Sequence, residues 1–116
     1  ENGTTNSDAD YSTALSGTWL IDYSSDEDGS NQDTTTRAGD YIVIDATQFD
    51  EMDVSGSTDR SGTISNLGPN SFNRTLTTDD STQYVEYSVT SSSLDLKFYS
   101  DSSKTTFYGR LVCSKQ

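Results

Sequence analysis

The side chains that could carry covalent chemistry in this 116-residue chain are hydroxyls and carboxylates, and they lack the partners that catalysis requires. The chain contains no histidine, so a serine nucleophile would have only Lys97, Lys104 or Lys115 as a nitrogen base. Nothing singles out one pair among the 19 acidic residues for glycoside hydrolysis, and most of them are expected to be solvated surface. We therefore predict that the protein is not an enzyme and binds no cofactor.

The acidic segment Asp26–Asp33 is the strongest candidate for a metal site. Its oxygen-bearing residues surround a glycine, as a Ca²⁺-binding loop requires, and its first four residues resemble the middle of an EF-hand loop. However, the first ligand position would be Ser24 and the closing position Thr35, and neither is a carboxylate. We predict a flexible acidic loop and no metal site, with Ca²⁺ binding as the alternative.

The single cysteine, Cys113, excludes an internal disulfide framework and a cysteine-rich zinc site. It alternates with Leu111 on one face of the last predicted strand. We expect a small buried thiol, because free cysteines are among the most buried residue types. The alternative is a disulfide bond to a second molecule, which an unpaired cysteine in an exported protein permits.

Charge and composition narrow the choice of partners. Acidic residues outnumber basic residues by 19 to 7, and the formal net charge is −12 at pH 7. Such a chain repels phosphate backbones and anionic lipid headgroups, which argues against nucleic acid or a membrane surface as its partner. No run of about 18 apolar residues is present, so we expect no membrane-spanning segment.

The domain organisation is simple. The polar residues 1–10 predict a flexible N-terminal segment, and residues 11–116 predict a single folded domain. Abundant serine, threonine and aspartate with few lysines favour a protein outside the cytoplasm, either periplasmic, secreted or lipid-anchored at the cell surface. The sequence leaves the oligomeric state open.

Apolar and β-branched residues fall into eight short runs whose alternation predicts strands. Turn residues separate these runs, and such short connections require neighbouring strands to be antiparallel. We therefore predict an all-β domain, a meander of about eight strands closed into a small barrel, with a β-sandwich as the alternative. Only Asp8–Leu15 could form a helical turn. The expected strands are residues 15–23, 41–46, 49–54, 62–67, 72–78, 83–90, 94–99 and 106–113.

The first and last predicted strands contain a pair of motifs. Gly17 and Trp19 form a G-x-W motif, and Arg110 lies in the last strand. This pattern resembles the lipocalin and calycin group, whose barrels open with G-x-W behind a short helical turn. The resemblance implies a small barrel in which Arg110 packs across the ring of Trp19, as a guanidinium over an indole is favourable.

An eight-stranded barrel has room for its own side chains or for one small ligand. We predict an interior filled by aromatic side chains; the alternative is a small apolar ligand bound by Trp19, Tyr87, Phe98 and Arg110. The residues expected to point inward are Trp19, Ile21, Tyr23, Val43, Phe72, Leu76, Val85, Tyr87, Leu96, Phe98 and Phe107.

A second function class is a structural or interaction domain that meets a protein partner and holds no internal ligand. Tyr84, Tyr99 and Tyr108 lie in consecutive late strands, on the side opposite the expected core. Tyrosine suits an interface because its ring packs while its hydroxyl stays hydrated. These three residues are the predicted interaction face.

Overall fold

The computed structural model describes residues 8–116, which form a short helix followed by eight strands. The helix α1 confirms the helical turn expected before the first strand. Of the predicted flexible segment, residues 1–7 lie outside the described residues, and residues 8–10 belong to this helix. The elements are α1 (Asp8–Leu15), β1 (Gly17–Ser25), β2 (Tyr41–Asp45), β3 (Gln48–Met52), β4 (Thr58–Ser65), β5 (Ser71–Leu76), β6 (Thr82–Val89), β7 (Ser93–Tyr99) and β8 (Phe107–Lys115).

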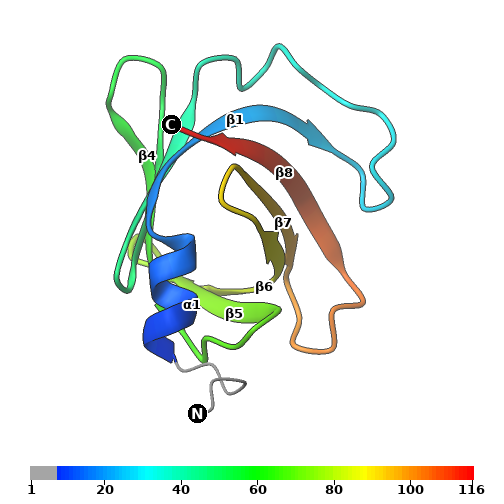
Figure 1. The fold of residues 1–116 in the computed structure, drawn as a ribbon. Coiled ribbons are helices and arrows are strands. Elements are labelled where there is room, and N and C mark those ends of the chain that lie inside the picture. The colour runs from blue at the N-terminus through cyan, green and yellow to red at the C-terminus, as the bar shows by residue number, and fades with distance from the viewer. Residues whose placement is uncertain (1–7) are drawn as a thin grey trace.

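The eight strands form one closed antiparallel barrel. Each strand pairs with the next along the chain, and β8 returns to pair with β1, so that the red and blue strands lie side by side in Figure 1. The prediction of an all-β meander closed into a barrel is confirmed, and the β-sandwich alternative is wrong. Closure leaves neither β1 nor β8 as an exposed sheet edge.

The apolar core lies inside the barrel and extends to the end that α1 covers. Leu15, the last residue of α1, is fully buried against this core. Ile42 and Ile44 point inward from β2, whereas Val43 lies on the opposite side of the strand, so the inward placement of Val43 is wrong. The buried core residues are Leu15, Trp19, Ile21, Ile42, Ile44, Phe49, Ile64, Phe72, Val85, Tyr87, Leu94, Leu96, Phe98, Leu111 and Cys113.

Three strand pairs contain a bulge, in which one strand has an extra residue and the alternation of faces shifts. The extra residues are Asp22 in β1, Asp59 in β4 and Tyr108 in β8. After the first bulge, Ser24 pairs with inward-pointing Leu111, and Tyr23 pairs with outward-pointing Val112. The expectation that Tyr23 points inward is therefore wrong.

The bulge in β8 changes two further side chains. Phe98 pairs with Gly109 and Tyr99 pairs with Phe107, so Tyr108 is the residue that the pairing skips. Phe107 then shares the outer face with Tyr99, whose ring centroid lies 5.9 Å away, and its predicted inward placement is wrong. Tyr108 instead lies at the open end of the barrel.

Aspartates build the loops at the end of the barrel opposite α1. Each accepts hydrogen bonds from the serine or threonine two residues later, and most accept both its backbone N–H and its hydroxyl. Hydrogen bonds lower the pKa of all five carboxyls, with the largest contribution from Thr36 at Asp33, from Thr105 at Asp101 and from the serine two residues later at the other three. The acidic side chains are therefore turn-forming groups. They are Asp28 and Asp33 between β1 and β2, Asp53 between β3 and β4, Asp79 between β5 and β6, and Asp101 between β7 and β8.

Candidate functional site

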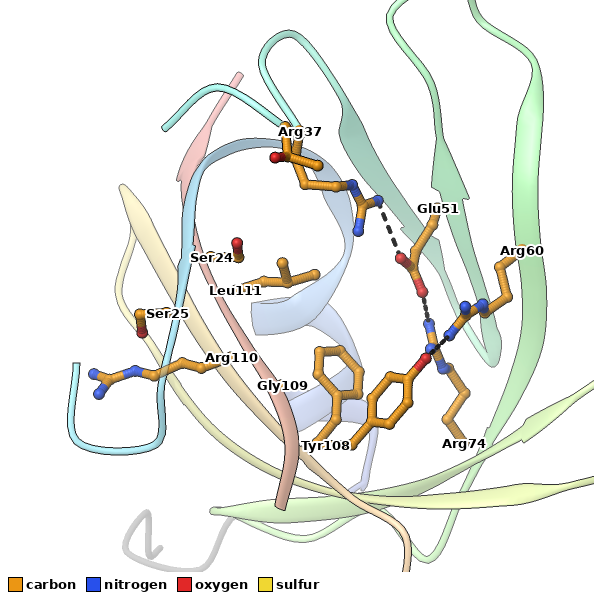
Figure 2. A pocket seen from close by; sticks show the side chains of 12 residues that line it. Ser24, Ser25, Arg37, Glu51, Arg60, Arg74, Tyr108, Gly109, Arg110 and Leu111 are labelled. Atoms are coloured by element: carbon orange, nitrogen blue, oxygen red, sulfur yellow. Dashed lines mark hydrogen bonds and ion pairs between the residues drawn. The ribbon is translucent and has the colours of Figure 1, made fainter. Parts of the chain in front are cut away.

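A cavity of about 300 Å³ opens at the end of the barrel opposite α1. We call this end the mouth; it lies where β1, β3 and β7 end and where β4 and β8 begin (Figure 2). All four arginines of the chain line the cavity, namely Arg37, Arg60, Arg74 and Arg110. Its other lining residues are Ser24, Ser25, Thr36, Glu51, Phe98, Tyr108, Gly109 and Leu111. In a protein with a net charge of −12, three of the four guanidinium groups, those of Arg37, Arg60 and Arg74, thus lie close to Glu51 at this cavity (Figure 2).

Glu51 connects two of these arginines. Its carboxylate lies 2.7 Å from Nη1 of Arg74 and 3.1 Å from Nη2 of Arg37, and it is only 5% exposed. Burial alone would raise the pKa of Glu51, but the positive charges of Arg74 and Arg37 outweigh burial and lower it. Glu51 is therefore an ionised internal counterion at neutral pH. The side chains meet in Figure 2 between β3, β5 and the loop that carries Arg37.

Arg74 is the most deeply placed charge of the site and is 1% exposed. Its guanidinium lies 4.5 Å from the ring centroid of Phe49 and 4.9 Å from that of Phe98. Nε and Nη2 donate hydrogen bonds to the Gln83 side chain, and Nη1 lies 2.7 Å from the Glu51 carboxylate. The guanidinium of Arg74 is thus held between Gln83, Glu51 and the two aromatic rings.

A glycine makes room for this arginine. A Cβ atom at Gly62 would lie 2.7 Å from Cγ of Arg74, which is closer than real Cβ contacts allow. Gly62 lies in β4, which pairs with β5, and it is itself buried. The arginine stem therefore occupies the space that a side chain on the neighbouring strand would need.

Arg60 is placed differently. It pairs with Glu51 across β3 and β4, but its side chain turns to Tyr108, where Nη1 lies 3.3 Å from the phenol oxygen. Its guanidinium also lies 5.9 Å from the Tyr108 ring centroid. Within residues 8–116, no carboxylate lies within 4.0 Å of Arg60. Arg60 is thus a cation at the mouth without an anionic partner in the described part of the chain.

Arg110 points away from the other arginines in Figure 2. Two of its nitrogens bind the Asp95 carboxylate at 3.0 and 2.6 Å, and a third donates to the Glu27 carbonyl at 3.1 Å. The predicted packing of Arg110 over Trp19 is therefore wrong. Alternation along β8 places Arg110 on the outer face, whereas Trp19 points into the core.

The cation over the tryptophan is Lys115, which pairs with Trp19 across β1 and β8. Its Nζ lies 4.4 Å from the indole and donates to the carbonyl of Ser16. A Cβ at Gly17 would lie within 3 Å of the same lysine, and the backbone φ of +137° at that residue favours glycine. The G-x-W motif is therefore explained by Lys115 and not by Arg110.

The four predicted ligand residues do not all line one cavity. Trp19 is fully buried near α1, and its Nε1 donates to the carbonyl of Leu15 at 2.8 Å. Tyr87 donates its hydroxyl to the carbonyl of Gly68 at 2.6 Å. Of the four predicted ligand residues, Phe98 and Arg110 line the cavity at the mouth. An interior filled by side chains is found at the α1 end, while the mouth holds open space.

The three predicted interface tyrosines do not form one exposed face. Tyr84 is half-buried, and Tyr99 is 3% exposed because its hydroxyl donates to Glu27 at 2.7 Å and its ring packs on Phe107. Tyr108 is 58% exposed, but it lies at the mouth. The expectation that all three are exposed together is wrong. The segment Asp26–Asp33 reaches across to Tyr99, which the strand pattern alone did not reveal.

Two candidates from the sequence remain, Cys113 and the acidic segment Asp26–Asp33. Cys113 is buried, as expected, and burial raises the pKa of its thiol to about 12. In the part of the chain that the structure describes, no group of three or more carboxylate or cysteine side chains is arranged to hold a metal ion. The carboxylates of Asp28 and Asp33 accept hydrogen bonds from their own loop.

Sequence reasoning missed Arg37, Glu51, Arg60 and Arg74 as site residues. Two of them had a readable signal. Arg74 alternates with Phe72 and Leu76, and Glu51 alternates with Phe49, so both are charged residues at inward positions of strands. A charge at an inward position requires a partner inside the barrel. Arg60 was missed because it lies before the predicted strand 62–67, although β4 extends the alternation of Gly62 and Ile64 to it, and Arg37 gave no such signal because it lies in a loop.

No helix among residues 8–116 is long and apolar enough to cross a membrane. Comparison with known proteins found no matching family model, no matching curated protein and no matching solved structure.

Proposed function

We propose that this chain is an exported, lipocalin-like binding domain without catalytic activity, and that it takes a small organic anion in the mouth of its barrel. The observation that carries this proposal is that three arginines, Arg37, Arg60 and Arg74, surround one cavity in an acidic protein. The G-x-W motif and the closed barrel support the lipocalin-like part of the proposal. The acidic, hydroxyl-rich composition supports a place outside the cytoplasm.

The anionic character of the ligand follows from the donors. A guanidinium presents several N–H groups in a planar fork that matches a carboxylate or a similar anion. Arg60 has no carboxylate within 4.0 Å among the described residues, and its guanidinium meets the Tyr108 hydroxyl at the cavity. It lies where water is partly excluded, so its attraction for an anion is stronger than at an open surface.

The cavity also has apolar walls. Phe98 and Leu111 line it from β7 and β8, and the interior behind them is filled by the core. The small apolar ligand considered in the sequence analysis is thus replaced by an anion with an apolar body. Its charged group lies against the arginines, and its apolar body lies against Phe98 and Leu111. A volume of about 300 Å³ limits that body to the size of a small aromatic or aliphatic group.

Benzoate is a suitable probe because it joins one carboxylate to one ring. We expect saturable one-to-one binding by calorimetry at pH 7 and low salt, weakened roughly tenfold or more by Arg60→Met. Lys97→Met removes the same charge from the outer face of β7 and is the matched control, which should bind as the unmodified protein does. No saturable binding, or equal affinity in all three proteins, would refute the proposal.

The alternative proposal is an interaction domain of the cell surface without an internal ligand. Tyr108 is the exposed member of the three predicted interface tyrosines, and Val54 is also exposed in the neighbouring β3–β4 loop. The benzoate titration separates the two proposals, since the alternative predicts no binding at the mouth.

A further inference from the structure

The charges of the mouth can be counted from the ion pairs. Arg37 is paired with Asp40 at 2.8 Å as well as with Glu51, and Arg110 is paired with Asp95. Arg74 is paired with Glu51. After these pairs are made, one positive charge is left over among the residues that line the cavity, and it belongs to Arg60.

Resting on the proposed function, we infer that Glu51 makes the site selective for monoanions, specifically a single carboxylate or similar group on a compact aromatic body. The anionic group lies against Arg60 and the Tyr108 hydroxyl, whereas Arg74 is held by Glu51. The aromatic body lies against Phe98 and Leu111.

A second anionic group on the ligand would meet Glu51. This carboxylate lines the cavity, is buried between Arg74 and Arg37, and cannot move into water without breaking its ion pairs. Like charges a few ångströms apart in a partly buried site repel strongly. The second anionic group of a dianion would therefore gain little binding free energy from a donor and lose more through repulsion by Glu51. Glu51 thus lowers the affinity for dianions.

The site can be tested with three aromatic probes that differ in charge. Phthalate carries two carboxylates, its monomethyl ester carries one on the same ring, and benzamide is the neutral counterpart of benzoate. For the unmodified protein we expect the monomethyl ester to bind at least roughly tenfold more tightly than phthalate, and benzamide to bind no better than phthalate.

Glu51→Gln removes the repelling charge while keeping the size of the side chain. We expect it to raise the affinity for phthalate relative to the monomethyl ester by roughly tenfold or more. The matched control is Glu86→Gln, which removes a charge from the outer face of β6, where Glu86 pairs with Lys104. It should leave the ratio of the two affinities unchanged.

Folding of the variants is checked first by their thermal unfolding. If Glu51→Gln does not fold, Asp40→Asn takes its place, because it frees the charge of Arg37 without altering Glu51. The expected change in the ratio then has the same sign and is smaller. No binding of benzoate to the unmodified protein would refute the proposed function itself. Binding of benzoate with equal affinity for phthalate and its ester, or with a ratio that neither variant changes, would refute only the role of Glu51.

Discussion

The two ends of this barrel are stabilised in different ways. At the α1 end, Leu15 and Trp19 are fully buried and Lys115 lies over the indole. At the mouth, arginines surround a buried carboxylate and open space. The α1 end gains free energy because apolar surface leaves water, whereas the mouth must offset the lost hydration of its charges through ion pairs.

This difference separates stability from binding within one small fold. A buried ion pair is a weak source of net stability, yet it holds donors in a fixed position next to a cavity. An end filled with apolar side chains offers no such donors. Shortening a buried side chain at the α1 end should therefore destabilise the protein in a way that a second substitution does not offset. At the mouth, replacing both members of an ion pair should cost less stability than replacing one of them.

The strongest test of the comparison is at the α1 end. Trp19→Ala removes a fully buried ring and its hydrogen bond to Leu15, and we expect it to lower the free energy of unfolding by about 3–5 kcal/mol. Urea unfolding followed by circular dichroism measures this loss. Val54→Ala, in an exposed loop, is the control and should stay within about 0.5 kcal/mol of the unmodified protein. Similar stabilities for the two variants would contradict this account of the core.

The mouth can be tested by removing one partner or both. Arg74→Met leaves Glu51 buried with Arg37 as its remaining ion-pair partner, and we expect a loss of about 3 kcal/mol. The double variant Arg74→Met, Glu51→Gln should recover part of that loss, because no buried carboxylate is then left with Arg37 as its single ion-pair partner. Urea unfolding of both variants provides the comparison. A double variant less stable than Arg74→Met alone would show that the charges stabilise the mouth by other means.

Acid should weaken the mouth selectively. The folded-state pKa of Glu51 lies below its usual value, because the attraction of Arg74 and Arg37 outweighs burial. Its contribution is therefore fully present above about pH 4.5 and is lost as the pH falls through the lowered pKa. The melting temperature of the unmodified protein should fall more steeply below pH 4.5 than that of Glu51→Gln. Subtracting one profile of melting temperature against pH from the other removes the contribution of the loop aspartates, which both proteins share. Parallel profiles would contradict the prediction.

The smallest expected effect concerns the cation over Trp19. Lys115→Met should cost about 0.5–1 kcal/mol and shift the tryptophan emission, because Nζ lies 4.4 Å from the indole. Arg110→Met should leave the emission unchanged, since Arg110 binds Asp95 on the outer face. Fluorescence and urea unfolding of the two variants measure both effects. A spectral change in Arg110→Met alone would indicate that Arg110, and not Lys115, packs over Trp19, as the family resemblance implied.

The fold could be predicted from the sequence because its signals are local. Each predicted strand overlaps an observed one, since alternation and turn residues act within a few neighbours. Antiparallel pairing followed from the shortness of the connections, and closure was favoured over a sandwich because it leaves no exposed sheet edges. The burial of Trp19 and Cys113 followed from the same alternation.

The site could not be predicted in the same way because its determinants are not local. A single extra residue moved Tyr108 to the mouth, and nothing in period-two alternation predicts where a bulge occurs. The ion pair between Arg37 and Glu51 joins a loop to a strand across 14 positions. Tyr99 is buried because a distant loop, through Glu27, lies over it.

The turn-forming aspartates of the mouth loops also affect how this protein can vary. Asparagine presents the same Oδ1 acceptor as aspartate, so Asp53→Asn or Asp79→Asn can keep the hydrogen bonds to Ser55 and Ser81 while removing a charge. Alanine at either position would remove the acceptor and leave the turn to its backbone hydrogen bonds alone. Surface charge and loop shape are thus separable properties of this chain. Replacing the turn-forming aspartates by asparagine would therefore give a much less acidic protein with the same loop shape at the mouth.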